Sequence, residues 1–329
     1  MNSRERVFAA IRHTQPDRVP LNIWLYQPRF GSEELKSAIE DKYGRLDGFY
    51  EAFGIDLMMN IVPLPYADYV PGPSGTVTTG VGGLPLEDIT SQCFRDPDDD
   101  SLYAGLADLI GRYGRDKAIV AHVWGAVESA YSFMGVEQTL MNLATQPERM
   151  AALFEMESAW SVRIAEHAMD LGADIIQISA DAGSTTGLLF SPRTWRKLVC
   201  PNDKRIVDAV QGRGKIAAMH NDGNIWQIMD DIVAMGVDIL HPLQISAGMN
   251  LGQVKKRYGD RLTINGGLDL SYMLPSAPEE DLVSTIEHTM ESLKPGGGFV
   301  FNTEHFVPAN VTLSRLELAY STALRYAHY

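Results

Sequence analysis

The stretch Lys215–Ile225, with the sequence KIAAMHNDGNI, is the part of the chain that decides the fold class. Its first half is a short apolar run typical of a buried strand, and a helical pattern begins at Ile225. Between the two, His220 and Asp222 follow the end of the strand. Open α/β sheets and (β/α)8 barrels both place their chemistry at strand ends of this kind. The stretch therefore predicts an α/β fold with a functional site at this strand end.

Similar apolar runs recur along the chain with helical patterns between them. The expected strands are Val19–Leu25, Ile55–Val62, Ala118–Trp124, Ile175–Ala180, Lys215–His220, Ile239–Leu243, Arg261–Asn265 and Gly298–Thr303. Most of these runs are continuously apolar, as expected of strands that are buried on both faces. Eight strands that alternate with helices favour a single (β/α)8 TIM barrel over an open sheet.

The segment over residues 63–117 is too long for one strand–helix unit. It contains TVTTGVGG at residues 76–83, which predicts a β-hairpin with glycine turns. An insertion after a barrel strand normally lies over the mouth of the active site. Because no linker or composition break interrupts the chain, we expect one domain over residues 1–329.

Composition excludes several classes of protein. The net charge of −14 argues against binding to nucleic acid or to a membrane through basic residues. Only two cysteines are present, Cys93 and Cys200, which is typical of a reducing cytosol and excludes a cysteine-rich zinc site. No apolar stretch approaches the roughly 18 residues of a membrane span, and the N-terminus lacks the apolar core of a signal peptide. We expect a cytoplasmic protein.

Polar and aromatic side chains gather at the predicted strand ends. They are Trp24, Tyr26, Asn60, His122, Trp124, Asp181, His220, Asp222, His241, Gln244, Asn265, Asp269, Asn302, Glu304 and His305. Some have a structural alternative: His122 and His241 suit hydrogen-bonded core histidines, and Asp269 suits a helix cap. The tryptophans either line a pocket or plug the barrel end.

His220 and Asp222 form the strongest candidate for a metal site. At positions i and i+2 of an extended segment, their side chains point the same way. Together with Glu304 or His305 from another strand end, they would offer nitrogen and oxygen ligands that suit catalytic zinc. Asp181 is a further ligand or a partner that orients a histidine. The alternative is that the aspartate caps the following helix while His220 bonds a backbone carbonyl.

Several motifs carry a family resemblance. They are RERV at residues 4–7, HTQPDRVP at 13–20, LFSP at 189–192, HNDGN at 220–224, GVD at 236–238, GMN at 248–250, YGD at 258–260 and GGLD at 266–269. Taken together, the chain resembles the uroporphyrinogen decarboxylase-like superfamily along essentially its whole length. The resemblance implies a (β/α)8 barrel, in agreement with the strand count.

The true decarboxylases of that superfamily remove acetate carboxylates from a tetrapyrrole without a cofactor. They are similar to one another in an Arg-Gln-Ala-Gly-Arg-Tyr stretch that grips substrate carboxylates. The corresponding residues 24–30 here read WLYQPRF, which keeps only Gln27 and Arg29. An octa-acid substrate needs cationic partners, and arginine is the usual one. This departure argues against the tetrapyrrole reaction.

The other branch comprises corrinoid-linked methyltransferases, and its coenzyme M members hold zinc through a His-x-Cys pair and a distant Cys. In the present chain His220 is kept, Asp222 stands in the first cysteine position and Glu304 in the second. An oxygen-rich site is a harder Lewis acid than a thiolate site. It is better suited to polarising an ether, hydroxyl or carboxylate oxygen than to activating a thiol.

The resemblance thus implies a zinc-dependent methyltransferase that demethylates a small methoxylated or methylated substrate and passes the methyl group to a corrinoid protein. The expected metal ligands are His220, Asp222 and Glu304, and Asp181 or His305 would protonate the leaving group. The expected substrate-binding residues are Trp24, Tyr26, Trp124 and Gln244. The corrinoid would come from a partner, because the chain lacks an Asp-x-His-x-x-Gly motif.

Two alternatives stay open, a cofactor-free decarboxylase and a non-catalytic barrel subunit. In the first of these, Asp222 or Asp181 would handle protons. A homodimer is compatible with each of the three interpretations.

Overall fold

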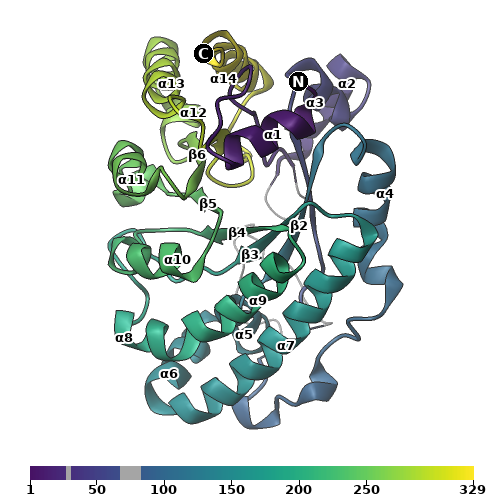
Figure 1. The fold of residues 1–329 in the computed structure, drawn as a ribbon, viewed down its shortest axis with the longest axis vertical. Coiled ribbons are helices and arrows are strands. Elements are labelled where there is room, and N and C mark those ends of the chain that lie inside the picture. Colours follow the sequence, from purple (N-terminus) through teal and green to yellow (C-terminus); the bar gives the residue numbers. More distant parts are fainter. Residues whose placement is uncertain (27–30, 67–82) are drawn as a thin grey trace. The chain divides into compact units, whose positions relative to one another are not determined.

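Seven strands alternate with helices along the chain, as the colours of Figure 1 follow it. Neighbouring strands of the sheet are consecutive in the chain. The computed structural model describes residues 1–26, 31–66 and 83–329. The strands are β1 (Leu57–Ile61), β2 (Ala118–Trp124), β3 (Ile175–Ser179), β4 (Ile216–Asn221), β5 (Ile239–Pro242), β6 (Thr263–Leu268) and β7 (Phe299–Thr303). The prediction of an α/β fold is confirmed, and these seven strands overlap seven of the eight predicted ones.

Helices of varied length connect the strands. The α-helices are α1 (Ser3–Ile11), α2 (Glu33–Tyr43), α3 (Leu46–Ala52), α4 (Ala104–Tyr113), α5 (Ala126–Met134), α6 (Val136–Thr145), α7 (Pro147–Leu171), α8 (Pro192–Thr194), α9 (Cys200–Gly212), α10 (Met229–Met235), α11 (Leu251–Tyr258), α12 (Met273–Ser276), α13 (Glu279–Leu293) and α14 (Leu313–Tyr326). A π-helical turn, η4 (Trp195–Val199), joins α8 to α9, and 3-10 turns cover Leu86–Asp88, Ser91–Cys93, Asp100–Tyr103, Trp226–Ile228 and Ile245–Ala247. Among the described residues, no helix combines the length and apolar character that crossing a membrane requires.

The chain divides into two compact units. Unit 1 comprises Met1–Met58, Asp116–Ala118 and Ile239–Tyr329, and unit 2 comprises Met59–Arg115 and Ile119–Asp238.

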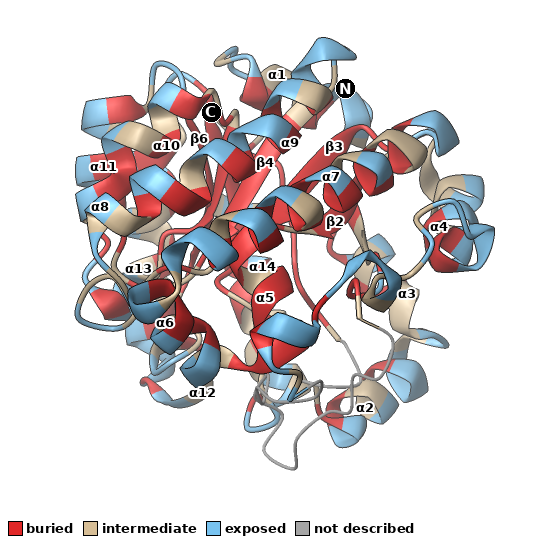
Figure 2. Cartoon of the chain, turned by 90° about the horizontal axis from the view of Figure 1, so that it is seen from below, coloured by how far each residue is buried: buried red, intermediate tan, exposed pale blue. Residues whose placement is uncertain are grey.

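Unit 2 contains the parallel strands β2, β3 and β4. Ile175 of β3 lies opposite Val120 on one side and Ile216 on the other. All five residues of β3 are buried, as expected for a continuous apolar run between two neighbours. Helix α9 packs on β3 and β4, and α7 runs alongside α9 (Figure 1). Both helices have one buried and one exposed side along their length (Figure 2).

Unit 1 contains the parallel strands β5, β6 and β7. Ile264 of β6 pairs with Leu240 and Phe299, and the β6–β7 register brings Leu268 opposite Thr303. Helices α13 and α14 pack against each other in the same unit. The last residues of β7 lead directly into Glu304 and His305.

The predicted strand Val19–Leu25 is the exception among the eight. It is extended but makes a single parallel bridge, from Leu21 to Phe301 of β7. Phe301 N donates to Pro20 O at 3.0 Å, and Pro20 has no N–H with which to continue a ladder. The eighth strand is therefore not confirmed. The predicted hairpin at residues 76–83 lies almost wholly outside the described residues.

The N-terminal motifs build a buried ionic network in unit 1. Asp56 is fully buried and pairs with Arg6 at 2.7 Å and with Arg18 at 2.8 Å. Arg6 also binds Asp17 at 2.7 Å, and Leu21 N donates to Asp56 at 2.8 Å. The RERV and PDRVP motifs thus have a structural role, because they neutralise a carboxylate beneath the sheet.

Candidate active site

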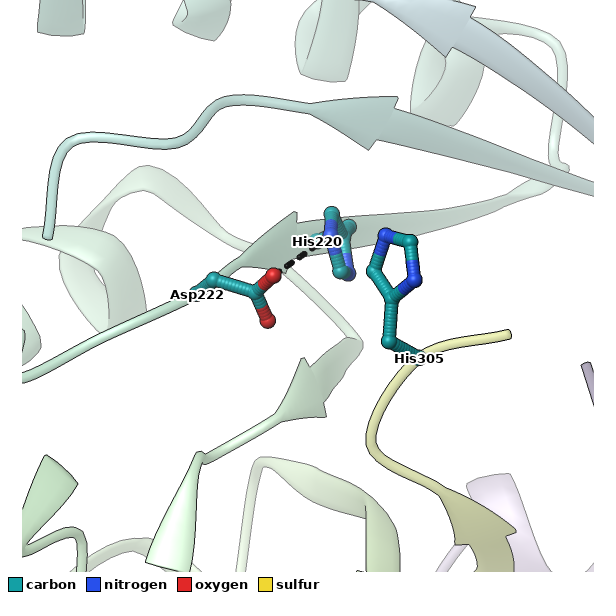
Figure 3. Close-up of side chains that lie close together, drawn as sticks. All are labelled: His220, Asp222 and His305. Atoms are coloured by element: carbon teal, nitrogen blue, oxygen red, sulfur yellow. Dashed lines mark ion pairs between the residues drawn. The ribbon is translucent and has the colours of Figure 1, made fainter. Parts of the chain in front are cut away.

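His220 and Asp222 lie together at the carboxyl end of β4, in unit 2. The imidazole is 3% exposed, and its Nε2 atom is 3.7 Å from Oδ2 of Asp222 (Figure 3). The two side chains therefore face the same side, as their i and i+2 spacing predicts. A separation of 3.7 Å is longer than a hydrogen bond and marks an ion-pair distance.

Asp181, from the loop after β3, joins the same group. Its Oδ1 atom is 3.7 Å from Nε2 of His220 and accepts a hydrogen bond from Asp222 N at 2.7 Å. The β3–β4 register sets Ser179 opposite His220, so residues just beyond the two strands become neighbours. Nε2 of His220 thus lies 3.7 Å from an oxygen of each of two carboxylates. Imidazole nitrogen and carboxylate oxygen are both ligands that zinc accepts in proteins.

The backbone beneath this group is unusually close-packed. Gly223 has a φ of +83°, and a Cβ atom there would lie 2.5 Å from the carbonyl carbon of Gly183. Asn221 joins the same two loops, because it accepts from Ala182 N at 3.0 Å and donates to Ala180 O at 2.6 Å. The Asn and Gly of the HNDG motif therefore hold the loops that carry His220 and Asp181.

Glu128 is a site residue that the sequence reasoning missed. It stands in the first turn of α5 and shares a side-chain hydrogen bond with Asp181. Burial, and then the charge of Asp181, raise the pKa of Glu128 well above its usual range. Burial also raises the pKa of Asp181. The sequence does contain one signal for Glu128, because it lies four residues after the end of β2, where functional residues of α/β folds are common.

Glu304 and His305 follow β7 in unit 1. Glu304 is 3% exposed and its Oε1 accepts from Ile245 N at 2.6 Å. Burial raises the pKa of Glu304 to about 8, so this carboxyl group is mostly protonated at neutral pH. Burial lowers the pKa of His305 to about 4, which keeps its imidazole neutral.

Aromatic rings surround the end of β7. Trp24 stacks on His241 with ring centroids 4.4 Å apart, and it lies 5.6 Å from His305 and 5.1 Å from Phe306. His241 is fully buried, and its Nε2 lies 2.9 Å from Thr303 O, so this nitrogen must carry the proton.

His122 and His241 are both buried and hydrogen-bonded, as expected of core histidines. His241 bonds a backbone carbonyl, as just described, and His122 Nδ1 lies 3.2 Å from Nε2 of Gln177. Asp269 accepts from Tyr272 N at 2.8 Å and from Met273 N at 2.7 Å, so its carboxylate holds the turn that leads into α12.

The other predicted substrate-binding residues lie in different places. Trp124 is half-buried in unit 2 and donates through Nε1 to Val62 O at 2.8 Å. Tyr26 and Gln244 lie in unit 1, where Tyr26 bonds Glu33 and Gln244 Nε2 donates to Ser246 Oγ at 3.1 Å. The site residues on which the structure converges in unit 2 are thus Asp181, His220 and Asp222, together with Glu128.

A family model and a curated relative that match this chain carry the same description. The model of the family described as "Uroporphyrinogen decarboxylase (URO-D)" matches residues 96–326. The uroporphyrinogen decarboxylase of Coxiella burnetii (strain Dugway 5J108-111) is 24% identical over 178 residues, which are 53% of this chain and 46% of that protein. The chain thus matches less than half of the length of this relative.

Two solved structures show the same fold over nearly the whole chain. A methyltransferase from Methanosarcina mazei has a TM-score of 0.75 at 17% identity, with 99% of both chains covered. The YdhT protein from Bacillus subtilis has a TM-score of 0.50 at 12% identity, covering 96% of this chain and 90% of that one. Because the family model spans well over half of the residues, the chain belongs to the uroporphyrinogen decarboxylase (URO-D) family.

Proposed function

We propose that this protein is a zinc-dependent methyltransferase that takes a methyl group from a small methoxylated or methylated compound and passes it to a corrinoid protein. The observation that carries the proposal is the placing of two carboxylates, Asp181 and Asp222, around one nitrogen of His220. The fold likeness to the Methanosarcina mazei methyltransferase adds support. So does the loss of the arginine-rich stretch that a tetrapyrrole octa-acid would need.

His220 and Asp222 would be two of the metal ligands, and the loop after β7 would supply a third. Alignment with the His-x-Cys enzymes favours Glu304 for this role. The surroundings of the two side chains favour His305, because Glu304 already accepts a backbone hydrogen bond and has a pKa of about 8. The imidazole of His305 is neutral at pH 7, as a metal ligand must be.

Zinc bound there would supply Lewis acidity toward the oxygen that loses the methyl group. When the methyl–oxygen bond breaks, its electron pair stays on that oxygen, which then needs a proton. Asp181 and Glu128 form a pair of acids with raised pKa values beside His220, and this pair can hold that proton. Trp24 would bound the apolar side of the substrate pocket next to His305.

Metal analysis tests the proposal directly. Purified protein should hold zinc stoichiometrically, and His220→Ala and Asp222→Ala should each lose most of it. His305→Ala should lower zinc content much more than Glu304→Gln, whereas the reverse order would assign the third ligand to Glu304. Zinc-free protein, with no change on replacing His220, would overturn the proposal.

The activity needs its own assay. The zinc-loaded protein should convert free cob(I)alamin to methylcobalamin, seen by absorbance, in the presence of a suitable donor from a panel of methoxylated aromatic compounds and methylated acids. The matched control is His220→Ala protein with the same donors.

A cofactor-free decarboxylase is the second candidate. The family match and the proton-holding pair of Glu128 and Asp181 favour it. It predicts loss of CO₂ from an acidic substrate that persists in metal-free protein and in His305→Ala.

A further inference from the structure

We infer that His241, in β5, is a positioning residue that holds the end of β7 and with it His305. The inference rests on the proposed function, in which His305 is a metal ligand, and adds a residue to it. All of the residues that carry it lie in unit 1.

The imidazole of His241 reaches past a whole strand. Its Nε2 atom donates to Thr303 O at 2.9 Å, although Thr303 ends β7 and β6 lies between the two strands. The two residues of β6 before the one opposite Thr303 are Gly266 and Gly267, which have no side chain. At these positions β6 therefore leaves room for the imidazole to cross.

Trp24 fastens the residues after β7 and stacks on the same imidazole. Trp24 N donates to Thr303 Oγ1 at 3.1 Å, and Trp24 O accepts from Val307 N at 2.9 Å. Trp24 is thus bonded to the chain both before and after His305. Its indole ring stacks on His241 with centroids 4.4 Å apart and lies 5.6 Å from the ring of His305. His241 therefore supports this segment twice, through a backbone oxygen and through the indole ring.

The residues that follow His241 are fixed as well. Leu243 is fully buried and has a φ of +61°, a left-handed conformation that a leucine keeps only where its surroundings impose it. Two residues later, Ile245 N donates to Oε1 of Glu304 at 2.6 Å. The chain around the end of β5 thus contacts the chain around the end of β7 at two points, and His241 stands on a constrained backbone.

These contacts give His241 a role that differs from metal binding. A carbonyl oxygen only accepts, so Nε2 of His241 carries a proton and donates it to the bond with Thr303 O. A ligand residue must be held within about 0.5 Å of its working position by neighbours that are themselves fixed. Groups that orient metal ligands typically matter by roughly 10- to 100-fold in metal affinity. His241 should therefore matter for zinc binding although its Nε2 atom does not contact the metal.

The test compares two replacements of His241 in the full-length protein. Zinc affinity is measured by competition with a chromophoric chelator. His241→Gln places an amide N–H near the position of Nε2, so its affinity should stay near that of wild type. His241→Phe keeps a ring for Trp24 and removes the donor, so its affinity should fall roughly 10- to 100-fold. His288→Phe, at an exposed histidine in α13, is the matched control and should bind zinc as wild type does.

Two results of this comparison would overturn the inference. An equal loss in His241→Gln and His241→Phe would assign the imidazole a role that a donor alone cannot fill. Wild-type affinity in His241→Phe would show that the bond to Thr303 O is not needed. If His241→Phe does not fold, His241→Asn takes its place, because its shorter amide cannot reach Thr303 O.

A double variant tests whether His241 acts through His305. In a His305→Ala background, His241→Phe should cost little further zinc affinity, because both changes remove the same contribution. A full further loss in the double variant would overturn the inference.

A second readout needs no zinc. In a crystal structure of metal-free His241→Phe, Thr303 O and the ring of His305 should have moved from their places beside Trp24. Unmoved residues would overturn the inference even where zinc affinity falls. Absence of zinc from wild-type protein, with His305 displaced in the variant, would instead count against the proposed function and leave the positioning role standing.

Discussion

The carboxylate of Asp222 lies 3.7 Å from the imidazole of His220, two residues before it in the chain. The pair occupies the positions of a His-x-Cys motif with an acid in place of the thiol. In the proposed metal site, the chemistry of this one side chain should therefore decide which metal ions bind best.

Asp222→Cys should shift metal preference toward soft ions. Thiolate binds Cd²⁺ better than it binds Mn²⁺, so the ratio of the two affinities should rise by about 10-fold or more. Competition titrations on the purified variant measure this ratio. Asp222→Asn is the control, since it should weaken both ions without changing their ratio. An unchanged ratio in Asp222→Cys would mean that residue 222 does not contact the metal.

Gly223→Ala should damage both stability and metal binding. The residue has a φ of +83°, and the added Cβ would meet the backbone of Gly183 at 2.5 Å. A positive φ alone costs about 1–3 kcal/mol for a non-glycine residue, and the backbone contact adds to that cost. Urea unfolding measures the loss of free energy, and zinc content reports on the loop.

The matched control for that variant is Gly212→Ala, in α9, where an added Cβ meets nothing within 4 Å. It should leave stability and zinc content unchanged or slightly improved. Equal behaviour of the two variants would show that the Gly183–Gly223 approach is not needed.

Arg6→Leu should destabilise the protein strongly. It leaves the fully buried Asp56 with Arg18 as its remaining ionic partner. Breaking a buried ion pair by removing one member costs about 3–5 kcal/mol. The measurement is the free energy of unfolding in urea at pH 7. Arg112→Leu, which removes the exposed pair with Asp108, should cost at most about 1 kcal/mol.

Asp203 should make stability fall as pH rises. Burial raises the pKa of Asp203 from 3.8 to about 7 in the folded protein, so its contribution is fully present below pH 3.8. This contribution to the free energy of unfolding is lost progressively between pH 3.8 and about pH 7, and Asp203 causes no further change above that pH. The full effect is roughly 4 kcal/mol, at about 1.4 kcal/mol for each pH unit between the two values.

Asp203→Asn should remove this pH dependence and keep an acceptor for Ala126 N. Urea unfolding at pH 5 and pH 8 would then give a smaller difference for Asp203→Asn than for wild type. The control is Asp208→Asn, at an exposed position on the same helix. A wild-type pH profile in Asp203→Asn would assign the effect to another group.

Much of the architecture followed from local pattern. Runs rich in apolar residues located seven strands to within about three residues, because strands that are buried on both faces consist mostly of apolar side chains. The period of two along a strand likewise predicted that His220 and Asp222 would share one side. The predicted strand Val19–Leu25 does not form a ladder because Pro20 has no N–H to donate and Trp24 N donates to the side chain of Thr303.

By itself, then, the sequence determined the alternation of strands and helices and the single strand end that carries His220 and Asp222. Tertiary structure alone decided that Asp181 reaches His220, because that contact depends on the β3–β4 register. It also decided that Asp203 of α9 caps the start of α5, where it accepts a hydrogen bond from Ala126 N. Such contacts join residues far apart in the chain, and their burial and shared protons arise only once the strands and helices have packed.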